Sequence, residues 1–259
     1  MTDRPPPPDP PLATTGALAA PSRGAAAPGT VRWGIGDAAA GWLVAMSGSA
    51  ILGGLVLALA GRLDDKPSTY PLWLVAILQV TLWLGLAGAP IVAGRWRGGG
   101  VVRDFGLRFR PIDVGVGAVV GLVGQLALVP LVSLPWVALL GKSSKDLEQP
   151  ARDLADRATS PVGVVLLVLI VVIGAPLIEE LFFRGLLLRA LQRRLGVAWA
   201  VAVSGLVFGL THFEVLQFPA LAAFGAVLAI VTVRAGRLGP AIVGHLVFNL
   251  VTVVSLLTS

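Results

Sequence analysis

The residues best suited to chemistry lie together at the end of a long hydrophobic run. Residues 161–178 carry no charge, and they lead directly into Glu179 and Glu180, with Arg184 four positions after Glu180. An ionised group at bilayer depth costs roughly 2.5 kcal/mol or more on insertion scales, so it is normally retained only where it lines a cavity or has a partner. The two glutamates are therefore the first candidates for a functional site.

Helical geometry gives these charged residues different surroundings. Glu180 and Arg184 are four residues apart and share a face, so they are expected to form an ion pair along the helix. Glu179 is rotated by about 100° from Glu180, so it is free to face a cavity. Pro176 lacks a backbone N–H, which predicts an unpaired Val172 carbonyl and a kink. The alternative is a cluster of charges that only holds helices together.

The chain has two histidines, and both lie in or at the edge of hydrophobic runs. One histidine on an apolar face is more often structural than catalytic, but two beside an intramembrane glutamate pair favour a site. If the chain turns near Gly196, Glu180 lies sixteen residues before the turn and His212 sixteen after it. Equal separations predict equal depth, about 24 Å from the turn.

Two further pairs of residues flank this arrangement. Gly205 and Gly209 lie on the same stripe as His212, and small residues allow helices to approach closely. His245 and Asn249 are four residues apart, so both project from one face of the last hydrophobic run. His245 is only about six residues inside that run, which predicts a shallower position for it than for His212.

Composition defines the class of protein. The 259 residues are 56% hydrophobic and 13% charged, and the mean hydropathy is +0.85. These values are typical of an all-α, polytopic transmembrane helical bundle. The chain has no cysteine, which excludes disulfides, thiolate metal sites and a cysteine nucleophile. No nucleic-acid partner is expected despite the net charge of +6, because Lys and Arg fall in short segments between hydrophobic runs.

Hydrophobic runs of spanning length predict about seven helices. They lie near residues 38–61, 71–94, 113–140, 161–192, 197–213, 218–234 and 239–257. Eight is the alternative, because Pro130 and Pro135 can divide the third run. Residues 1–30 are rich in Pro, Ala, Gly and Ser and are predicted to be a disordered tail without a secretory signal. Residues 31–259 are then the membrane domain.

The distribution of positive charge predicts the orientation of the chain. With an internal N-terminus, the internal segments of the seven-helix arrangement carry 13 Lys and Arg, the external ones carry 6, and Arg184 lies in the membrane. Because cytoplasmic loops carry an excess of Lys and Arg, the N-terminus is predicted to be cytoplasmic in this multi-pass protein.

Three motifs in order resemble the CAAX protease and bacteriocin-processing family of intramembrane endopeptidases, which includes CAAX prenyl protease 2-like proteins. That family is marked by E-E-x-x-x-R, F-x-x-x-H and H-x-x-x-N on successive helices. The chain has these as Glu179-Glu180-x-x-x-Arg184, Phe208-x-x-x-His212 and His245-x-x-x-Asn249. The resemblance covers about residues 161–257, the expected catalytic core.

The resemblance implies hydrolysis of a peptide bond in a membrane-associated peptide or protein, with membrane lipids and that substrate as partners. It implies that Glu179 and His212 activate water, that Arg184 holds Glu180, and that His245 and Asn249 stabilise the oxyanion. Family members are also described as metalloproteases. Zinc held by His212, His245 and Glu179 therefore stays open beside a mechanism without a cofactor.

Two other functions are compatible with the same residues. The buried Glu, Arg and His side chains can form a proton relay in a transporter, although the helices show no repeated halves. A non-catalytic membrane protein that binds partners or confers immunity to a peptide toxin is the other alternative. Cleavage of a substrate by purified protein separates the three.

Overall fold

The computed structural model describes residues 31–258, and within this range the regular elements are all helical. The predicted tail, residues 1–30, lies outside the described residues. The elements are α1 (Ile35–Leu59), η1 (Pro67–Thr69), α2 (Leu72–Arg97), α3 (Val101–Phe105), α4 (Ile112–Val123), η2 (Gly124–Leu128), α5 (Val129–Leu139), α6 (Ser144–Ala155), α7 (Pro161–Leu167), η3 (Val168–Gly174), α8 (Ala175–Glu180), η4 (Leu181–Leu187), α9 (Leu188–Leu210), α10 (Phe218–Ala235) and α11 (Gly239–Thr258).

Between residues 31 and 258, six helical segments are long and apolar enough to cross a membrane, which confirms the polytopic helical bundle. One of them, Pro161–Leu210, contains the fourth and fifth predicted runs. Gly196 within it has a left-handed φ of 75°, a conformation that glycine adopts without steric cost. The predicted turn is thus present at Gly196. The helices before and after it adjoin without a loop and form one segment, so six segments correspond to seven predicted runs.

The third hydrophobic run is not divided by its prolines. Ile112–Leu139 is a single candidate span that contains both prolines. Pro130 is the second residue of α5, directly after the π-helical η2, and Pro135 lies further inside α5. The π-helical η2 precedes them, so a change of helical register accompanies these prolines without ending the helix.

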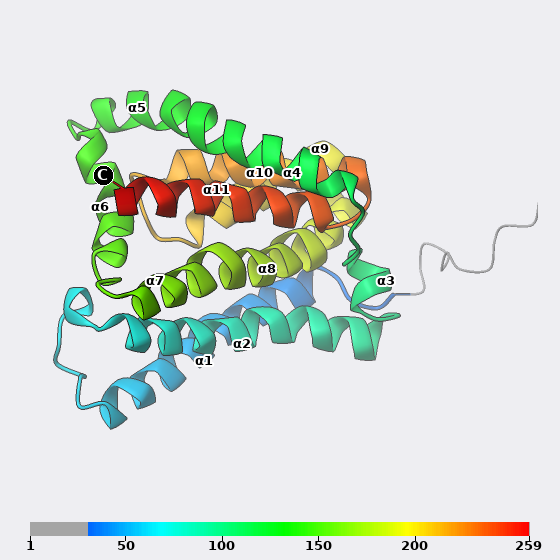
Figure 1. Ribbon diagram of the computed structural model, residues 1–259. Coiled ribbons are helices and arrows are strands. Elements are labelled where there is room, and N and C mark those ends of the chain that lie inside the picture. The colour runs from blue at the N-terminus through cyan, green and yellow to red at the C-terminus, as the bar shows by residue number, and fades with distance from the viewer. Residues whose placement is uncertain (1–30, 259) are drawn as a thin grey trace, which may run out of the picture. The chain divides into compact units, whose positions relative to one another are not determined.

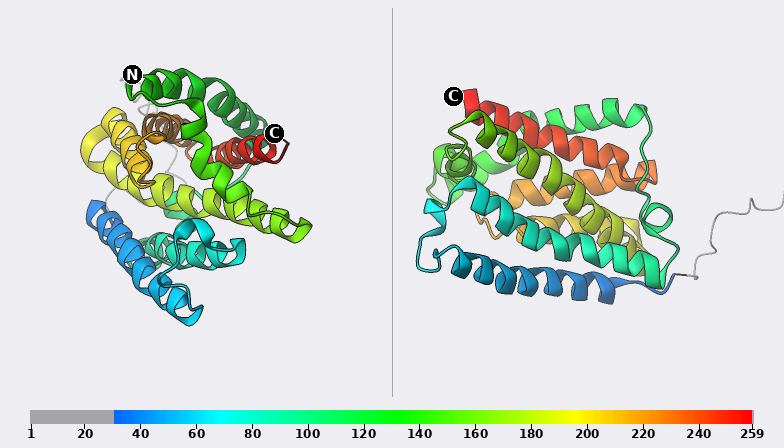
Figure 2. Two further views of the ribbon diagram at one scale, coloured as in Figure 1. Left: turned by 90° about the vertical axis from the view of Figure 1, so that its left-hand side faces the viewer. Right: turned by 60° about the horizontal axis from the view of Figure 1, so that its bottom comes forward.

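The helix formed by α7, η3, α8 and η4 occupies a central position in the described bundle. It packs against α2 on one side and against α11 on another, as both ribbon views show (Figures 1 and 2). The other helices pack mainly in pairs, with α1 against α2, α4 against α11, and α9 against α10. The glutamate pair therefore lies on the element with neighbours on several sides.

Small residues bring these helices close together, as the sequence predicts for Gly205 and Gly209. A Cβ atom on Gly205 would lie 2.7 Å from the Ala222 carbonyl oxygen of α10, and one on Gly209 would lie 2.9 Å from the Ala222 nitrogen. In a membrane, where apolar side chains gain little by leaving lipid, such close backbone approach is a main source of helix association. This packing fixes α9, and His212 lies in the turn directly after its end at Leu210.

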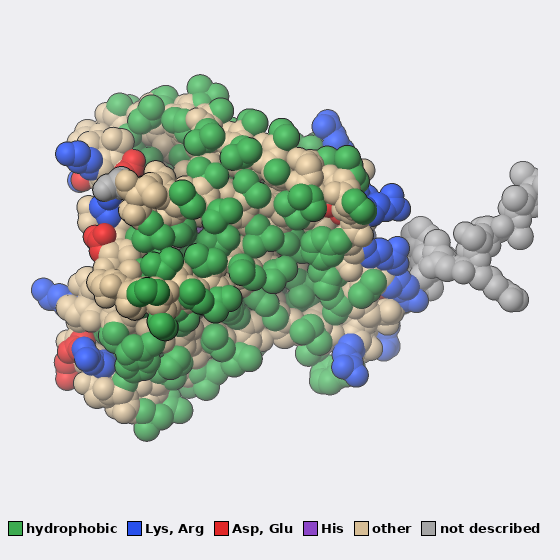
Figure 3. Space-filling model, viewed as in Figure 1, with side chains coloured by type: hydrophobic (Ala, Val, Ile, Leu, Met, Phe, Trp, Pro, Cys, Tyr) green, Lys and Arg blue, Asp and Glu red, His purple; other side chains and the backbone are tan. Residues whose placement is uncertain are grey.

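The outer surface of the described bundle is a broad apolar band with charges at its two ends (Figure 3). Large side chains such as Leu43, Ile51 and Leu131 point outward. Charged side chains inside are few, and Glu180 and Arg184 are both completely buried. Apolar side chains outside and an ion pair inside are the reverse of the arrangement in soluble proteins, and this is expected where the surrounding solvent is lipid.

Candidate active site

A change of helical register precedes the glutamate pair. Residues Val168–Gly174 are π-helical, so each carbonyl pairs with the N–H five residues later instead of four. In this register Pro176 deprives Val171, not Val172, of its donor. The Asn249 amide of α11 donates to the Val171 carbonyl at 2.8 Å and takes the place of the missing N–H. The carbonyl that receives this replacement donor is thus that of Val171, one residue before the predicted Val172.

This contact predicts that the contribution of Asn249 to stability depends on the presence of Pro176. We expect Asn249→Ala to lower stability by about 1–3 kcal/mol, the usual cost of an unpaired buried polar group. In a Pro176→Ala background position 176 regains an N–H, so Asn249→Ala should cost less. Thermal unfolding of the four purified proteins measures this coupling. Equal costs in the two backgrounds would show that the Val171 carbonyl does not need Asn249.

The ion pair predicted from the sequence is present. Arg184 Nη1 donates to Glu180 Oε1 at 2.8 Å, and both side chains are completely buried. Arg184 Nη2 donates to the Gly225 carbonyl of α10 at 3.0 Å, and its guanidinium lies 4.2 Å from the centre of the Phe208 ring. Arg184 thus fixes Glu180 and joins the central helix to both α9 and α10.

His245 approaches both glutamates. Its Nδ1 is 2.9 Å from Glu180 Oε1, and its Nε2 is 4.0 Å from Glu179 Oε2. Since a carboxylate only accepts, Nδ1 carries the hydrogen in this contact. The imidazole therefore lies between the two carboxylates, with one nitrogen bonded to Glu180 and the other directed toward Glu179.

The prediction that His245 lies too shallow to converge with the other site residues is wrong. The helix from Pro161 to the turn at Gly196 is about 50 Å long by its residue count, whereas the 20 residues of α11 span about 30 Å. The longer helix extends past the start of α11, where Arg193 donates to the backbone carbonyls of Val31 and Trp33. The ends of these two helices therefore lie at different depths, so residue counts from them cannot be compared directly.

Glu179 differs from Glu180 in exposure and in partners. Its side chain is 15% exposed, and it forms no hydrogen bond within residues 31–258. The gap of 4.0 Å to His245 is too long for a direct hydrogen bond, but polar groups at such separations are commonly bridged by water. Glu179 is thus the carboxylate of the pair that is free to act on a water molecule.

His212 lies across the Phe208 ring from His245. Its Nδ1 is 2.8 Å from the Phe208 carbonyl, and because a carbonyl only accepts, Nδ1 donates. The ring of Phe208 contacts both imidazoles, with centroid distances of 4.8 Å to His212 and 5.7 Å to His245. No hydrogen bond or ion pair joins His212 to Glu179 in the described chain. In the neutral imidazole this leaves Nε2 of His212 as an acceptor.

Charge balance describes what this cluster can do. Glu180 and Arg184 neutralise each other, and Glu179 adds one negative charge that an imidazolium at His245 would balance. In that form both nitrogens of His245 donate, Nδ1 to Glu180 and Nε2 toward the side of Glu179. In that form the site would combine an acceptor carboxylate, an acceptor imidazole and a donor imidazolium in a region of low dielectric constant, where such interactions are strong.

A metal site is not assembled by these residues. Across residues 31–258 no three His, Cys, Asp or Glu side chains gather as a metal ion requires. Nδ1 of His245 is engaged with Glu180, and Nδ1 of His212 is engaged with its own helix. The arrangement of donors does not fit zinc held by His212, His245 and Glu179.

Some features of the site have no signal in the sequence. Gly225 supplies a carbonyl to Arg184, and its own lack of a side chain lets the Phe208 ring approach, since a Cβ there would lie 3.0 Å from that ring. A second π-helical stretch, η4, follows Glu180 directly. π-helical turns are rare and are frequent at functional sites.

Comparison with known proteins supports the resemblance. The family model for type II CAAX prenyl endopeptidase Rce1-like matches residues 161–251, which contain all seven motif residues. No curated protein and no solved structure matches the chain.

Proposed function

We propose that the protein is an intramembrane endopeptidase, because residues 161–251 match the family model for type II CAAX prenyl endopeptidase Rce1-like. Its reaction is the hydrolysis of a peptide bond in a membrane-associated peptide or protein. The observation that carries the proposal is the placement of His245, between the buried Glu180–Arg184 pair and the partly exposed Glu179. In this arrangement Glu180 orients His245, and Glu179 is left to act as the base.

Glu179 is the general base of the proposed reaction. Its carboxylate takes a proton from a water molecule whose other hydrogen is accepted by Nε2 of His212. The water oxygen bonds to the carbonyl carbon of the peptide, and the carbonyl oxygen becomes an oxyanion. When the C–N bond breaks, the proton on Glu179 passes to the leaving nitrogen. A positioned carboxylate in this role is a common form of acid–base catalysis.

His245 and Asn249 stabilise the oxyanion in this proposal. The imidazolium of His245 is held by Glu180 and donates from Nε2. Asn249 uses one amide hydrogen for the Val171 carbonyl, which leaves the other for the oxyanion. Donors fixed before the reaction need no reorganisation as charge develops, and removing one such donor typically costs about 100- to 1000-fold in rate.

The test of the proposed function is peptide release by the purified full chain in liposomes. The substrates are a membrane-spanning peptide, a peptide with a C-terminal prenyl group, and the same peptide without the lipid, each with a fluorophore and a quencher on either side of the scissile region. Release from at least one membrane-bound substrate is expected. No release from any of them, with folded protein, would favour a transporter or a binding protein.

We expect the activity to be independent of a metal ion. Exhaustive chelation should leave the rate of cleavage unchanged, because within residues 31–258 the side chains of His212, His245 and Glu179 do not gather as a metal ion requires. Elemental analysis and activity of the same chelated sample provide the measurement. One equivalent of zinc, with activity lost on its removal and restored on its return, would make His212 and His245 metal ligands.

We also propose that the N-terminal end of α1 faces the cytoplasm. That end of the described bundle carries most of its arginines, including those of the segments after α2 and α10. Because the chain has no cysteine, single cysteines report orientation cleanly. In intact cells an impermeant maleimide should label Lys142→Cys and spare Arg95→Cys until the membrane is permeabilised. The opposite pattern would reverse the orientation.

A further inference from the structure

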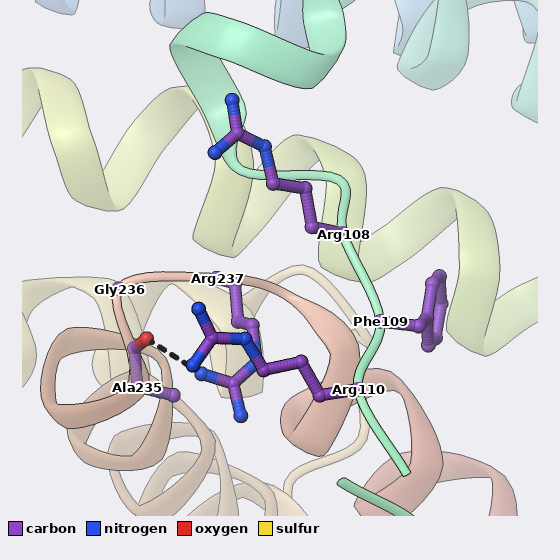
Figure 4. Close-up of a pocket in the computed structure, with 6 residues that line it drawn as sticks. All are labelled: Arg108, Phe109, Arg110, Ala235, Gly236 and Arg237. Atoms are coloured by element: carbon purple, nitrogen blue, oxygen red, sulfur yellow. Dashed lines mark hydrogen bonds between the residues drawn. The ribbon is translucent and has the colours of Figure 1, made fainter. Parts of the chain in front are cut away.

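A hollow of about 470 Å³ lies at the arginine-rich end of the described bundle, away from the glutamates. Its lining consists of Arg108, Phe109, Arg110, Ala235, Gly236 and Arg237 (Figure 4). The first three belong to the segment between α3 and α4, Ala235 is the last residue of α10, and Gly236 and Arg237 lie in the turn between α10 and α11. None of these residues belongs to the proposed active site.

Backbone hydrogen bonds hold the two walls of the hollow together. The Leu238 N–H donates to the Gly106 carbonyl at 2.8 Å, and the Gly239 N–H donates to the Arg108 carbonyl at 3.2 Å. Gly106 has a left-handed φ of 67°, which lets the chain turn here without strain. The arginines of the hollow therefore project from a fixed frame.

The positive charge in the hollow is only partly neutralised. Arg237 pairs with Asp113 through two of its nitrogens and also donates to the Ala235 carbonyl at 3.1 Å. The guanidinium groups of Arg108 and Arg110 form no hydrogen bond or ion pair within residues 31–258. Figure 4 shows the Arg110 side chain extended toward Arg237. In the same view the Arg108 side chain is directed away from these two. Two uncompensated positive charges thus line one hollow, and long arginine side chains can turn toward an anion with several acceptor oxygens.

The hollow lies where the apolar surface of the bundle begins. Phe109 is 55% exposed, and Ile112, one residue after Pro111, is 62% exposed at the start of α4. Figure 3 shows positively charged side chains at this edge of the apolar band. This is the level at which the headgroups of lipids lie, and basic pockets between helices at that level bind anionic headgroups.

We propose that this hollow binds the phosphate of an anionic phospholipid. Arg108 and Arg110 contact the phosphate oxygens, Arg237 is held beside them by Asp113, and Phe109 packs against the upper part of the acyl chains. The ligand is assigned to lipid, not to free phosphate, because Phe109 and the adjoining face of α4 are apolar and exposed.

The test uses the purified full chain in detergent, titrated with dioleoylphosphatidylglycerol and followed by native mass spectrometry and thermal unfolding. The Arg108→Gln/Arg110→Gln variant should bind about 30-fold more weakly, given the usual contribution of each basic residue near anionic lipid. The control Arg95→Gln/Arg194→Gln removes the same charge from exposed residues at the same end of the bundle, outside the hollow. It should bind like the parent.

Two further titrations distinguish the source of the phosphate. Dioleoylphosphatidylcholine, which has no net charge, should bind weakly and equally to all three proteins, and inorganic phosphate at millimolar concentration should not stabilise the parent. Equal losses of affinity in the two double variants would overturn the site. Stabilisation by inorganic phosphate that is lost only in Arg108→Gln/Arg110→Gln would overturn the assignment to lipid. Unfolding temperatures without lipid confirm that the variants are folded.

Discussion

Glu179→Gln is expected to lower the rate of peptide cleavage by about 100- to 10,000-fold, the usual contribution of a general acid–base residue. Glutamine preserves the volume of the side chain but cannot take a proton from water. Because Glu179 forms no hydrogen bond within the described residues and its side chain is partly exposed, stability should change little. The measurement is the initial rate at saturating substrate, with the unfolding temperature of the same sample.

The neighbouring glutamate provides the matched control. Glu180→Gln should lower activity and also the unfolding temperature, since it leaves Arg184 buried without an ionised partner. His212→Ala should lower activity with little change in stability, as Glu179→Gln does. Within the described residues, the hydrogen bond and the ring contact of His212 are both with Phe208. Substantial activity in Glu179→Gln would remove Glu179 from the chemistry, and the same result for His212→Ala would remove His212.

Arg184→Ala is expected to destabilise the protein by about 3–5 kcal/mol, the usual cost of breaking a buried ion pair. The change leaves Glu180 buried with His245 as its remaining partner. It also removes a donor from the Gly225 carbonyl and the guanidinium that lies over Phe208. Activity should fall as well, because Glu180 orients His245. Thermal or denaturant unfolding of purified protein in one detergent measures the effect.

Two variants separate charge from packing at this position. Arg184→Lys keeps the charge but cannot serve Glu180 and Gly225 with a planar fork, so an intermediate stability is expected. Glu180→Gln combined with Arg184→Met removes both charges, and this double variant should be less destabilised than Arg184→Ala. If Arg184→Ala unfolds at the temperature of the parent, Glu180 has another partner and its orienting role must be abandoned.

Local features of the bundle were predictable from the sequence. The ends of the apolar runs agree with α1, α2, α10 and α11 within a few residues, because length and hydropathy alone decide whether a helix can span a bilayer. The Glu180–Arg184 pair follows from a spacing of four on one helix. The turn at Gly196 and the close packing at Gly205 follow from the absence of a side chain on glycine.

Features that depend on the register and inclination of helices were not predictable. The π-helical turns before and after the glutamates shift which carbonyl Pro176 leaves unpaired, and no residue type marks them. The depth of His245 depends on how far the central helix extends past the start of α11, and the end of that helix contacts residues 31 and 33 through Arg193. Such contacts join segments far apart in the chain, so spacing along one helix does not reveal them.

The most direct test of the proposed endopeptidase is cleavage of a membrane-bound peptide in water enriched in ¹⁸O. Purified parent protein and Glu179→Gln are reconstituted side by side, and the products are weighed by mass spectrometry. We predict that the parent cuts the peptide at a defined bond and places one ¹⁸O atom in the new carboxyl group, whereas Glu179→Gln forms little product. No cleavage by folded parent protein, or equal cleavage by the two proteins, would contradict the proposal.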